Sequence, residues 1–217
     1  MGLVLRRRGQ ISLEFMLVFS VMLIMLLYSV KNVGFDSSSP SSSTLAIQIA
    51  LEEKSLANAI SNTISQVYAQ GPGSKATTYI KVVYLRNPSY LEKGLNVVTP
   101  RIFITYGSYP SGGNGTYVAV VNGTGTARLI RLGEGKNAFW SRAMYQADLF
   151  KNSSVWVSPR VTLKWADDGV TVYGLGLDPA TLPSELKIVV EWNPDREDSW
   201  FYNGTAGELR ININPGG

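Results

Sequence analysis

Carboxyl and hydroxyl groups are what this chain can use for chemistry, because its 217 residues include neither Cys nor His. Their absence excludes thiol nucleophiles, zinc sites made of Cys and His, and Ser-His-Asp catalysis. A pair of carboxylates could still hydrolyse a glycan, but the adjacent residues Asp167 and Asp168 indicate a turn rather than two groups that face a substrate. The residue types therefore predict a protein that is not an enzyme and that needs no cofactor.

The densest acidic segment follows residues 192–194 and contains Asp195, Glu197 and Asp198. Loops rich in oxygen ligands bind Ca²⁺. However, Arg196 lies within the segment, and the spacing does not match an EF-hand loop. We therefore expect a solvated acidic turn and no metal site, with Ca²⁺ binding as the alternative.

Four N-glycosylation sequons begin at Asn114, Asn122, Asn152 and Asn203. Three of them contain Asn-Gly, which is also a common hairpin turn. The sequence leaves open whether these positions carry sugars or only form turns.

The positive charge of the chain is concentrated at its start. The net charge is +4, and it falls to +1 when Arg6, Arg7 and Arg8 are left out. A nearly neutral remainder does not predict binding to nucleic acid. Basic residues that precede an apolar segment are instead typical of a signal that orients a protein in a membrane.

An apolar segment covers residues 11–30 and is interrupted only by Ser12, Glu14, Ser20 and Ser29. As a helix it would be about 30 Å long, which matches the hydrocarbon core of a bilayer. Its large apolar side chains, at about 2 kcal/mol each, do not remain in water. The segment predicts a helix over residues 10–33 that lies in lipid or against the same helix of other chains.

The residues around Gly9 differ from a secretory signal, whose cleavage site follows the apolar stretch. Here the basic residues end at Gly9, and Gln10, Ser12, Glu14 and Phe15 open the apolar stretch. A cut between Gly9 and Gln10 would remove the charges and leave the helix attached. This segment resembles the class III signal peptide of archaeal type IV pilin-like proteins.

The resemblance implies that a membrane-embedded prepilin peptidase removes residues 1–9. The mature chain would then wait in the cytoplasmic membrane with its head outside. An assembly ATPase and a platform membrane protein would move it into a surface filament, beside copies of itself or other pilins. The resemblance implies a pilin, and it does not distinguish a major pilin from a minor one.

Glu14 has a physical role in this scheme, because cleavage makes it the fifth residue of the mature chain. A carboxylate on an apolar helix costs about 2.5–3.5 kcal/mol at a membrane centre. The new α-ammonium group of Gln10 is four residues away, on the same helical face. The pair could form within one chain or between neighbours. The competing interpretation is an uncleaved signal anchor with Glu14 at the membrane surface.

A Ser- and Pro-rich joint is predicted over residues 34–44, and it leaves open whether the stalk is one continuous helix. Residues 45–70 follow with the period of an amphipathic helix, which Gly71 and Pro72 end. Its apolar arc consists of Leu45, Ile49, Leu56, Ile60, Ile64 and Val67. We expect this face to pack on the β-domain of the same chain, with a bundle between subunits as the alternative.

From residue 75 onward, the apolar period becomes that of strands. The expected strands are Thr78–Leu85, Arg101–Tyr106, Thr116–Val121, Ala127–Leu132, Arg160–Trp165, Val170–Leu175, Leu186–Trp192 and Glu208–Ile213. Hairpins are predicted at residues 122–123 and 167–169. With no helical pattern among the strands, we expect an antiparallel β-sandwich head over residues 75–217. The predicted fold class is α+β, with a hydrophobic stalk helix, an amphipathic helix and this head.

The sequence thus predicts a structural subunit of an archaeal type IV pilus-like surface filament, with adhesion as a further role. One alternative is a membrane-anchored extracellular binding domain that does not polymerise. A more remote one is an extracellular carbohydrate-active enzyme.

Overall fold

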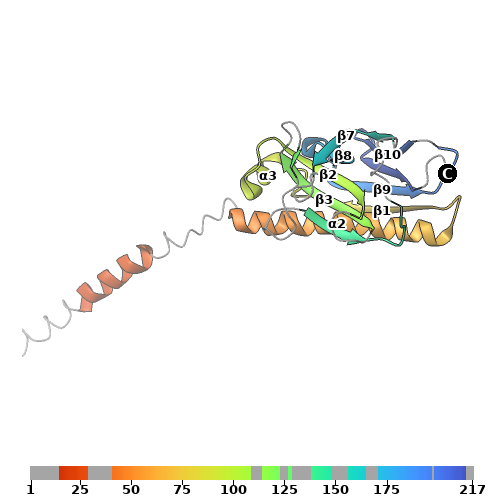
Figure 1. Ribbon diagram of the computed structural model, residues 1–217. Helices are drawn as coiled ribbons and strands as arrows, with labels where there is room; N and C mark the ends of the chain where they lie inside the picture. Colours follow the sequence, from red (N-terminus) through yellow and green to blue (C-terminus); the bar gives the residue numbers. More distant parts are fainter. Residues whose placement is uncertain are drawn as a thin grey trace, which may run out of the picture. The chain divides into compact units, whose positions relative to one another are not determined.

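The computed structural model describes residues 15–28, 41–108, 114–122, 127–128, 138–147, 156–164, 171–196 and 198–213. The chain divides into two units, Met1–Pro40 and Ser41–Gly217. The first unit contains a helical segment over residues 15–28. The second unit, called the head below, contains the labelled helices and strands (Figure 1).

The head begins with a long helix, and strands follow with two short helices among them. The helices are α2 (Ser42–Gln70), α3 (Pro88–Leu95) and the 3-10 helix η1 (Pro179–Thr181). The strands are β1 (Lys75–Lys81), β2 (Pro100–Gly107), β3 (Gly115–Asn122), β4 (Ala127–Arg128), β5 (Ala138–Arg142), β6 (Trp156–Ser158), β7 (Arg160–Lys164), β8 (Thr171–Leu177), β9 (Glu185–Glu191), β10 (Asp198–Asn203) and β11 (Glu208–Asn212).

The strands form two sheets that are mainly antiparallel. The five-stranded sheet has the order β1-β9-β11-β10-β6, and the six-stranded sheet has the order β4-β7-β8-β2-β3-β5. The pairs β9–β11, β6–β10 and β4–β7 are parallel. The α+β class and the mainly antiparallel pairing of the strands are confirmed, and the three parallel pairs were not expected. In the five-stranded sheet, β11 lies between β9 and β10. It runs antiparallel to β10 and parallel to β9.

Helix α2 covers the predicted amphipathic helix and starts inside the predicted joint. Its N-cap is Ser41, whose side-chain oxygen accepts a hydrogen bond from the Thr44 backbone N–H at 3.3 Å. Gly71 ends the helix with a φ of 87°, which favours glycine. The apolar stripe is at most 1% exposed at all six predicted positions, which are Leu45, Ile49, Leu56, Ile60, Ile64 and Val67.

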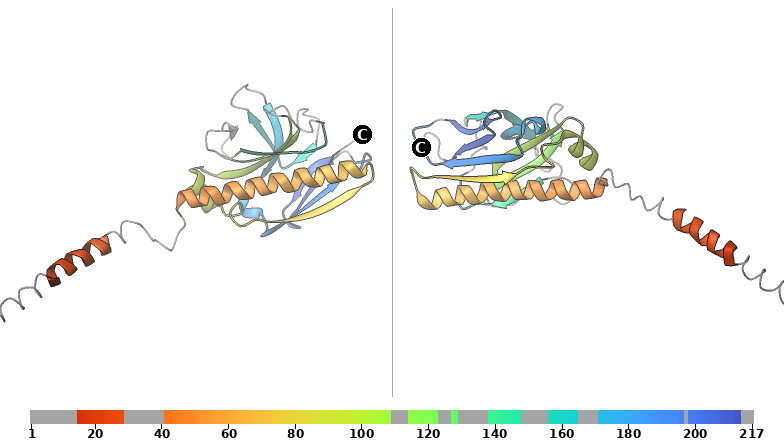
Figure 2. Two further views of the ribbon diagram at one scale, coloured as in Figure 1. Left: turned by 90° about the horizontal axis from the view of Figure 1, so that it is seen from below. Right: turned by 180° about the vertical axis from the view of Figure 1, so that it is seen from behind.

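Helix α2 lies along both sheets. It contacts β1 and β9 of the five-stranded sheet and β3 and β5 of the six-stranded sheet. In the left view of Figure 2, the helix crosses the head with strands of the two sheets on either side. One hydrophobic core includes Ile60 of α2, Ile188 of β9 and Ile104 of β2, all fully buried. The expectation that this helix packs on its own β-domain is confirmed.

The six-stranded sheet buries side chains on both faces. Val118 and Val120 of β3 belong to the core that includes α2, whereas Tyr117 and Ala119 belong to a second buried cluster. Successive residues of a strand point to opposite faces, so two buried faces require a nearly continuous apolar run. This explains the uninterrupted apolar sequence of β3.

Helix α3 lies between β1 and β2 in the chain, where no helix was predicted from the sequence. Asn87 caps it, and Pro88 occupies its first position. The helix packs closely on the first turns of α2 at Gly94. A Cβ atom added to Gly94 would lie 2.9 Å from Ile49 Cδ1 and 3.0 Å from Leu45 Cβ. The contact stabilises a helix that is too short to form alone.

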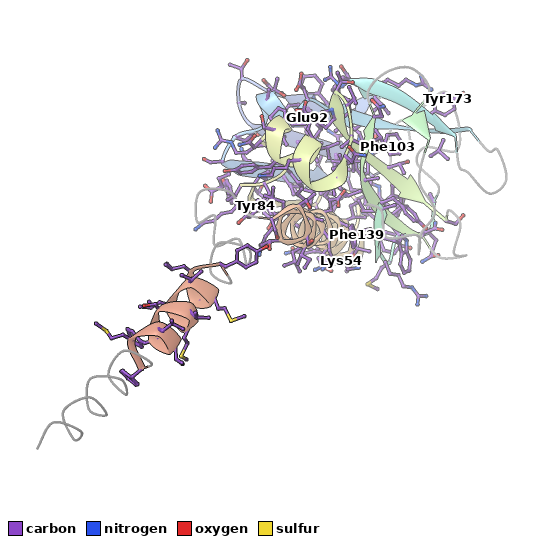
Figure 3. The ribbon with its side chains drawn as sticks, turned by 90° about the vertical axis from the view of Figure 1, so that its left-hand side faces the viewer. Lys54, Tyr84, Glu92, Phe103, Phe139 and Tyr173 are labelled. Atoms are coloured by element: carbon purple, nitrogen blue, oxygen red, sulfur yellow. The ribbon has the colours of Figure 1, made fainter. Side chains whose placement is uncertain are left out.

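The strand predicted over residues 78–85 is shifted relative to β1, which ends at Lys81. The reason lies in α2, where the Glu52 carboxylate accepts three backbone hydrogen bonds of 2.8–2.9 Å. The donors are the N–H groups of Val83, Tyr84 and Leu85. Because a side chain satisfies these groups, they need no neighbouring strand. In Figure 3, which looks towards the start of α2, Tyr84 lies on one side of the helix and Lys54 on the other.

Six other predicted strands agree with β2, β3, β7, β8, β9 and β11 to within two residues at each end. Strand β4 begins the predicted strand 127–132, whose remaining residues lie outside the described part. The structure adds β5, β6 and β10, which the sequence analysis did not find. The hairpin at residues 167–169 is supported by the antiparallel pairing of β7 with β8, although the turn itself is not among the described residues.

The hairpin predicted at residues 122–123 is wrong. It would pair β3 with β4, but β3 already pairs with β2 on one edge and with β5 on the other. Strand β4 instead pairs in parallel with β7. An Asn-Gly turn cannot form a hairpin when both edges of the first strand are occupied.

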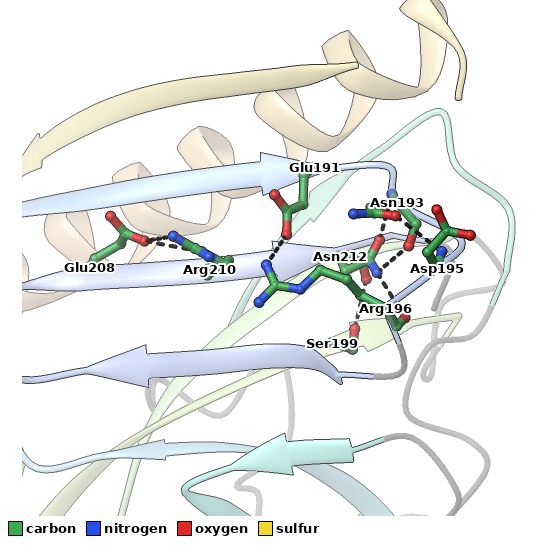
Figure 4. A network of polar contacts seen from close by, with 8 residues as sticks. All are labelled: Glu191, Asn193, Asp195, Arg196, Ser199, Glu208, Arg210 and Asn212. Carbon is green, nitrogen blue, oxygen red and sulfur yellow. Dashed lines mark hydrogen bonds and ion pairs between the residues drawn. The ribbon is translucent and has the colours of Figure 1, made fainter. Parts of the chain in front are cut away.

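Charged side chains line strands of the five-stranded sheet (Figure 4). Glu208 pairs with Lys187 at 2.8 Å and with Arg210 at 2.9 Å. The hydrogen bond from Lys187 is the main cause that lowers the pKa of Glu208. Arg196 pairs with Glu191 at 2.8 Å. This sheet therefore places apolar residues in the core and ion pairs outside it.

Candidate functional site

The candidate assembly segment is the helix over residues 15–28. It contains no charged residue, and its only residue outside the apolar and aromatic types is Ser20. The Ser20 hydroxyl donates a hydrogen bond to the Met16 carbonyl oxygen at 2.8 Å. A serine that bonds to the preceding turn of its own helix does not require an external polar partner.

Every residue of this helix is exposed. The large apolar side chains range from 45% exposed at Leu23 to 69% at Phe15 and Tyr28. The rings of Phe15 and Phe19 are nearly parallel, with centroids 6.2 Å apart. A helix that is apolar around its whole circumference is typical of one that is surrounded by lipid or by other helices.

The predicted stalk helix over residues 10–33 is described only over residues 15–28. Among the described residues, none of the helices has both the length and the apolar character that crossing a membrane requires. The long apolar N-terminal helix of the sequence analysis is therefore not found in this part of the chain.

The predicted processing residues lie outside the described part of the chain. These are Gly9 and Gln10 at the expected cut, and Ser12 and Glu14 of the signal motif. Phe15, the last residue of that motif, is the first described residue and lies in the apolar helix. The cut and the pairing of Glu14 remain predictions from the sequence.

The structure distinguishes among the predicted glycosylation positions. Asn114 is only 8% exposed, and Thr116 of the same sequon is fully buried. The Thr116 N–H donates to the Ser61 hydroxyl of α2 at 3.1 Å, so this sequon belongs to the interior of the head. In the folded head, Asn114 is thus a poor substrate for a glycosylating enzyme.

The other described sequons are at the surface. Asn122 is exposed at the end of β3, where its side-chain oxygen accepts a hydrogen bond from Thr99 at 3.4 Å. Asn203 is exposed at the end of β10, and its side-chain oxygen accepts from the N–H groups of Thr205 and Ala206. That turn leaves the Asn203 side-chain nitrogen, the atom that a glycan would join, outside these bonds. Asn152 is not among the described residues.

The acidic segment near Asp195 forms a turn. The Asp195 N–H donates to the Asn193 side-chain oxygen at 3.0 Å, and Asn212 donates to the carbonyl oxygens of Asn193 and Arg196 (Figure 4). Asp198 is the first residue of β10, and Glu197 lies outside the described part. Within the described residues, no three metal-binding side chains of the Asp, Glu, His or Cys type come together.

Two acidic residues of α2, which were not predicted as site residues, organise the head. Glu52 binds the chain after β1, as described above. Glu53 is fully buried against β3. Its position could have been noticed, because it lies four residues after Ile49 and three before Leu56, within the apolar stripe.

Comparisons of the chain with models of protein families, with curated proteins and with solved structures find no match.

Proposed function

We propose that the chain is a structural subunit, a pilin, of an archaeal type IV pilus-like surface filament, assembled through its N-terminal apolar helix. The observation that carries this proposal is the helix over residues 15–28, which has no charge and exposes all of its side chains. It is supported by the signal motif at Gly9, Gln10, Ser12, Glu14 and Phe15.

The exposed side chains of this helix require a partner surface. Burial of each large apolar side chain contributes about 2 kcal/mol. A helix that lies flat on a membrane keeps one polar face, and this helix has none over residues 15–28. Lipid provides a suitable environment before assembly, and the same helix of neighbouring copies provides it afterwards.

The head supports a division of roles between the two units. Its core is closed by α2 and the two sheets, so it buries its own apolar surface. In a filament, the helices would hold the subunits together and the heads would form the outer surface, where adhesion could take place.

Assembly of such helices depends on more than apolar burial. A helix that moves from lipid to a helical bundle exchanges one apolar environment for another, so packing and paired polar groups determine the order. After cleavage by a prepilin peptidase, the Gln10 amine and the Glu14 carboxylate would be such a pair. An assembly ATPase and a platform membrane protein would transfer the subunit from the cytoplasmic membrane to the cell surface.

The proposal is tested by N-terminal sequencing and intact-mass measurement of the protein from native membranes and from sheared filaments. We expect a chain that begins at Gln10 in the fibres, and an uncut precursor for the variant Gly9→Val. Soluble protein whose chain has been cut after Val30, so that the apolar segment is lost, would contradict the proposal. Uncut protein in membranes without fibres would support the anchored binding domain instead.

A second variant tests how the subunits assemble. Glu14→Ala should be cut normally but should give few fibres, because removal of one member of a dry ion pair costs about 3–5 kcal/mol. Ser20→Ala is the matched control, since the Ser20 hydroxyl already bonds to Met16 of its own helix. Normal fibre yield from Glu14→Ala would argue against the charge pair.

A further inference from the structure

A carboxyl group lies inside the head at the contact between α2 and the six-stranded sheet. The side chain of Glu53 is fully buried, on the same stripe of α2 as Ile49, Leu56 and Ile60. A carboxylate in such a position needs several hydrogen bonds or a cation to remain charged.

Glu53 has fewer partners than a charged group requires. Its Oε1 accepts one hydrogen bond, from the Val120 N–H at 2.8 Å. Its Oε2 is buried and has no hydrogen-bond partner. The pairing of β5 with β3 ends at Ala119 and Ala138. Glu53 thus satisfies the N–H group of the next residue of β3, beyond the last described pair with β5.

Within the described part of the chain, the neighbouring charges are directed elsewhere. On α2, Glu52 binds the backbone after β1, and Lys54 donates to the Trp140 carbonyl oxygen. On the six-stranded sheet, Tyr117 belongs to the cluster on the opposite face, and Arg142 is exposed.

The titratable residues on the other elements that contact α2 are Tyr90, Glu92 and Lys93 of α3, Lys75, Tyr79 and Lys81 of β1, and Glu185, Lys187 and Glu191 of β9. None of them is among the causes that shift the pKa of Glu53. Burial is the main cause that raises the pKa of Glu53 well above its usual value, and only the hydrogen bond from Val120 opposes it.

We propose that Glu53 is a proton-dependent lock between α2 and β3: the neutral acid holds the helix on the six-stranded sheet, and loss of the proton weakens this contact. The inference concerns the head alone and does not depend on the proposed filament. It predicts a head that is more stable in mildly acidic solution than in neutral or alkaline solution.

The sign of this effect follows from proton binding. In the unfolded chain, Glu53 titrates near its ordinary pKa of about 4.3. At pH values between this and the higher pKa of the folded head, unfolding releases one proton. The equilibrium constant for unfolding then increases about tenfold with each unit of rising pH. The stabilisation is complete below the unfolded value and is lost as the pH rises through the folded one.

Glu208 does not cancel this slope above pH 5. Its pKa is lowered, chiefly by the hydrogen bond from Lys187, so its contribution is present above the unfolded value and is lost only in acid. Measurements between pH 5 and pH 8 therefore separate the effect of Glu53 from that of Glu208.

The test is chemical unfolding of the full chain in detergent micelles, followed by tryptophan fluorescence from pH 5 to pH 8. Wild-type protein should lose stability as the pH rises from 5, by up to about tenfold in the equilibrium constant per unit, until the pH passes the folded pKa of Glu53. Glu53→Gln keeps the shape of the side chain and cannot ionise, so its stability should be nearly independent of pH. Glu52→Gln is the matched control, and it should be less stable at every pH but keep the wild-type slope.

Two outcomes would overturn the lock: a wild-type slope that Glu53→Gln retains, or a wild-type protein that becomes more stable as the pH rises. A measurement without substitution covers the case in which Glu53→Gln fails to fold. The carboxyl ¹³C resonance of Glu53 in the wild-type protein should titrate well above pH 4.3, and an ordinary midpoint near that value would refute the proposal.

Discussion

The helix over residues 15–28 and helix α2 are both rich in apolar residues, yet they differ completely in burial. In α2 most large apolar residues lie on one stripe, and Ile49, Ile60 and Ile64 of this stripe are fully buried within the head. In the first helix the apolar residues surround the axis, and even the least exposed of the large ones, Leu23, is 45% exposed. The head thus provides a partner for a striped helix.

This difference teaches that the distribution of apolar residues, rather than their number, determines which partner a helix needs. A stripe can be buried by one surface of the same chain. A helix that is apolar all round requires partners on every side, such as lipid or several other helices. The contrast is also the physical basis of the proposed function, and three pairs of variants can break or sharpen it.

The largest effect is expected from a charge in the first helix. Ile24→Lys should reduce recovery in membranes and fibres by about two orders of magnitude, because a lysine at a membrane centre costs about 2.5–3.5 kcal/mol. Quantitative immunoblotting of membrane, fibre and soluble fractions measures this distribution.

The matched control for that charge is Ile47→Lys in α2. Ile24 is 66% exposed and Ile47 is 60% exposed, so the two positions are similarly accessible but belong to different helices. We expect Ile47→Lys to leave the distribution and the unfolding temperature of the head unchanged. Equal losses from both variants would remove the distinction between the two helices.

An effect confined to the stability of the head is expected from removal of one side chain from the stripe of α2. Ile60→Ala should lower the free energy of unfolding by about 2–5 kcal/mol, because it leaves a cavity in the core between α2 and the two sheets. Leu51→Ala, on the 60% exposed position of the same helix, should change it by less than about 0.5 kcal/mol. Denaturant unfolding monitored by circular dichroism measures both values, and similar losses would show that α2 is not docked by this stripe.

The smallest effect is expected at the contact of α3 with α2. Gly94→Ala places a methyl group 2.9 Å from Ile49 Cδ1 and 3.0 Å from Leu45 Cβ. This overpacking is partly offset by the higher helix propensity of Ala, so the net cost should be about 1 kcal/mol. Ser89→Ala, at an exposed position of α3, is the control and should be nearly neutral. Thermal unfolding of both variants checks the prediction, and a neutral Gly94→Ala would mean that the two helices can separate slightly at no cost.

Several features could be predicted because the residues that cause them are close together in the sequence. The start of α2 needs Ser41 and Thr44, and its end needs Gly71. The strands with the strongest β-branched and aromatic patterns, such as β2, β3 and β9, were also found to within two residues. The predicted processing site rests on a local motif of the same kind, and sequencing of the mature N-terminus tests it.

Two of the features that were missed depend on residues far apart in the sequence. Strand β1 ends early because Glu52 of α2 binds the following backbone groups. Asn114 has the local sequence of a glycosylation site, but the Ser61 side chain of α2 bonds to the backbone of Thr116 in the same sequon. No pattern within either segment contains this information.

The sequence by itself determined the extent of α2 and of most strands to within a few residues, and the apolar character of residues 15–28, because capping, turns and apolar period act over a few residues. Only the tertiary structure decided the order of strands in the two sheets, the parallel position of β11 and the burial of Glu53. These depend on which strand edges and helix faces remain free after the others have packed, and that competition involves the whole head.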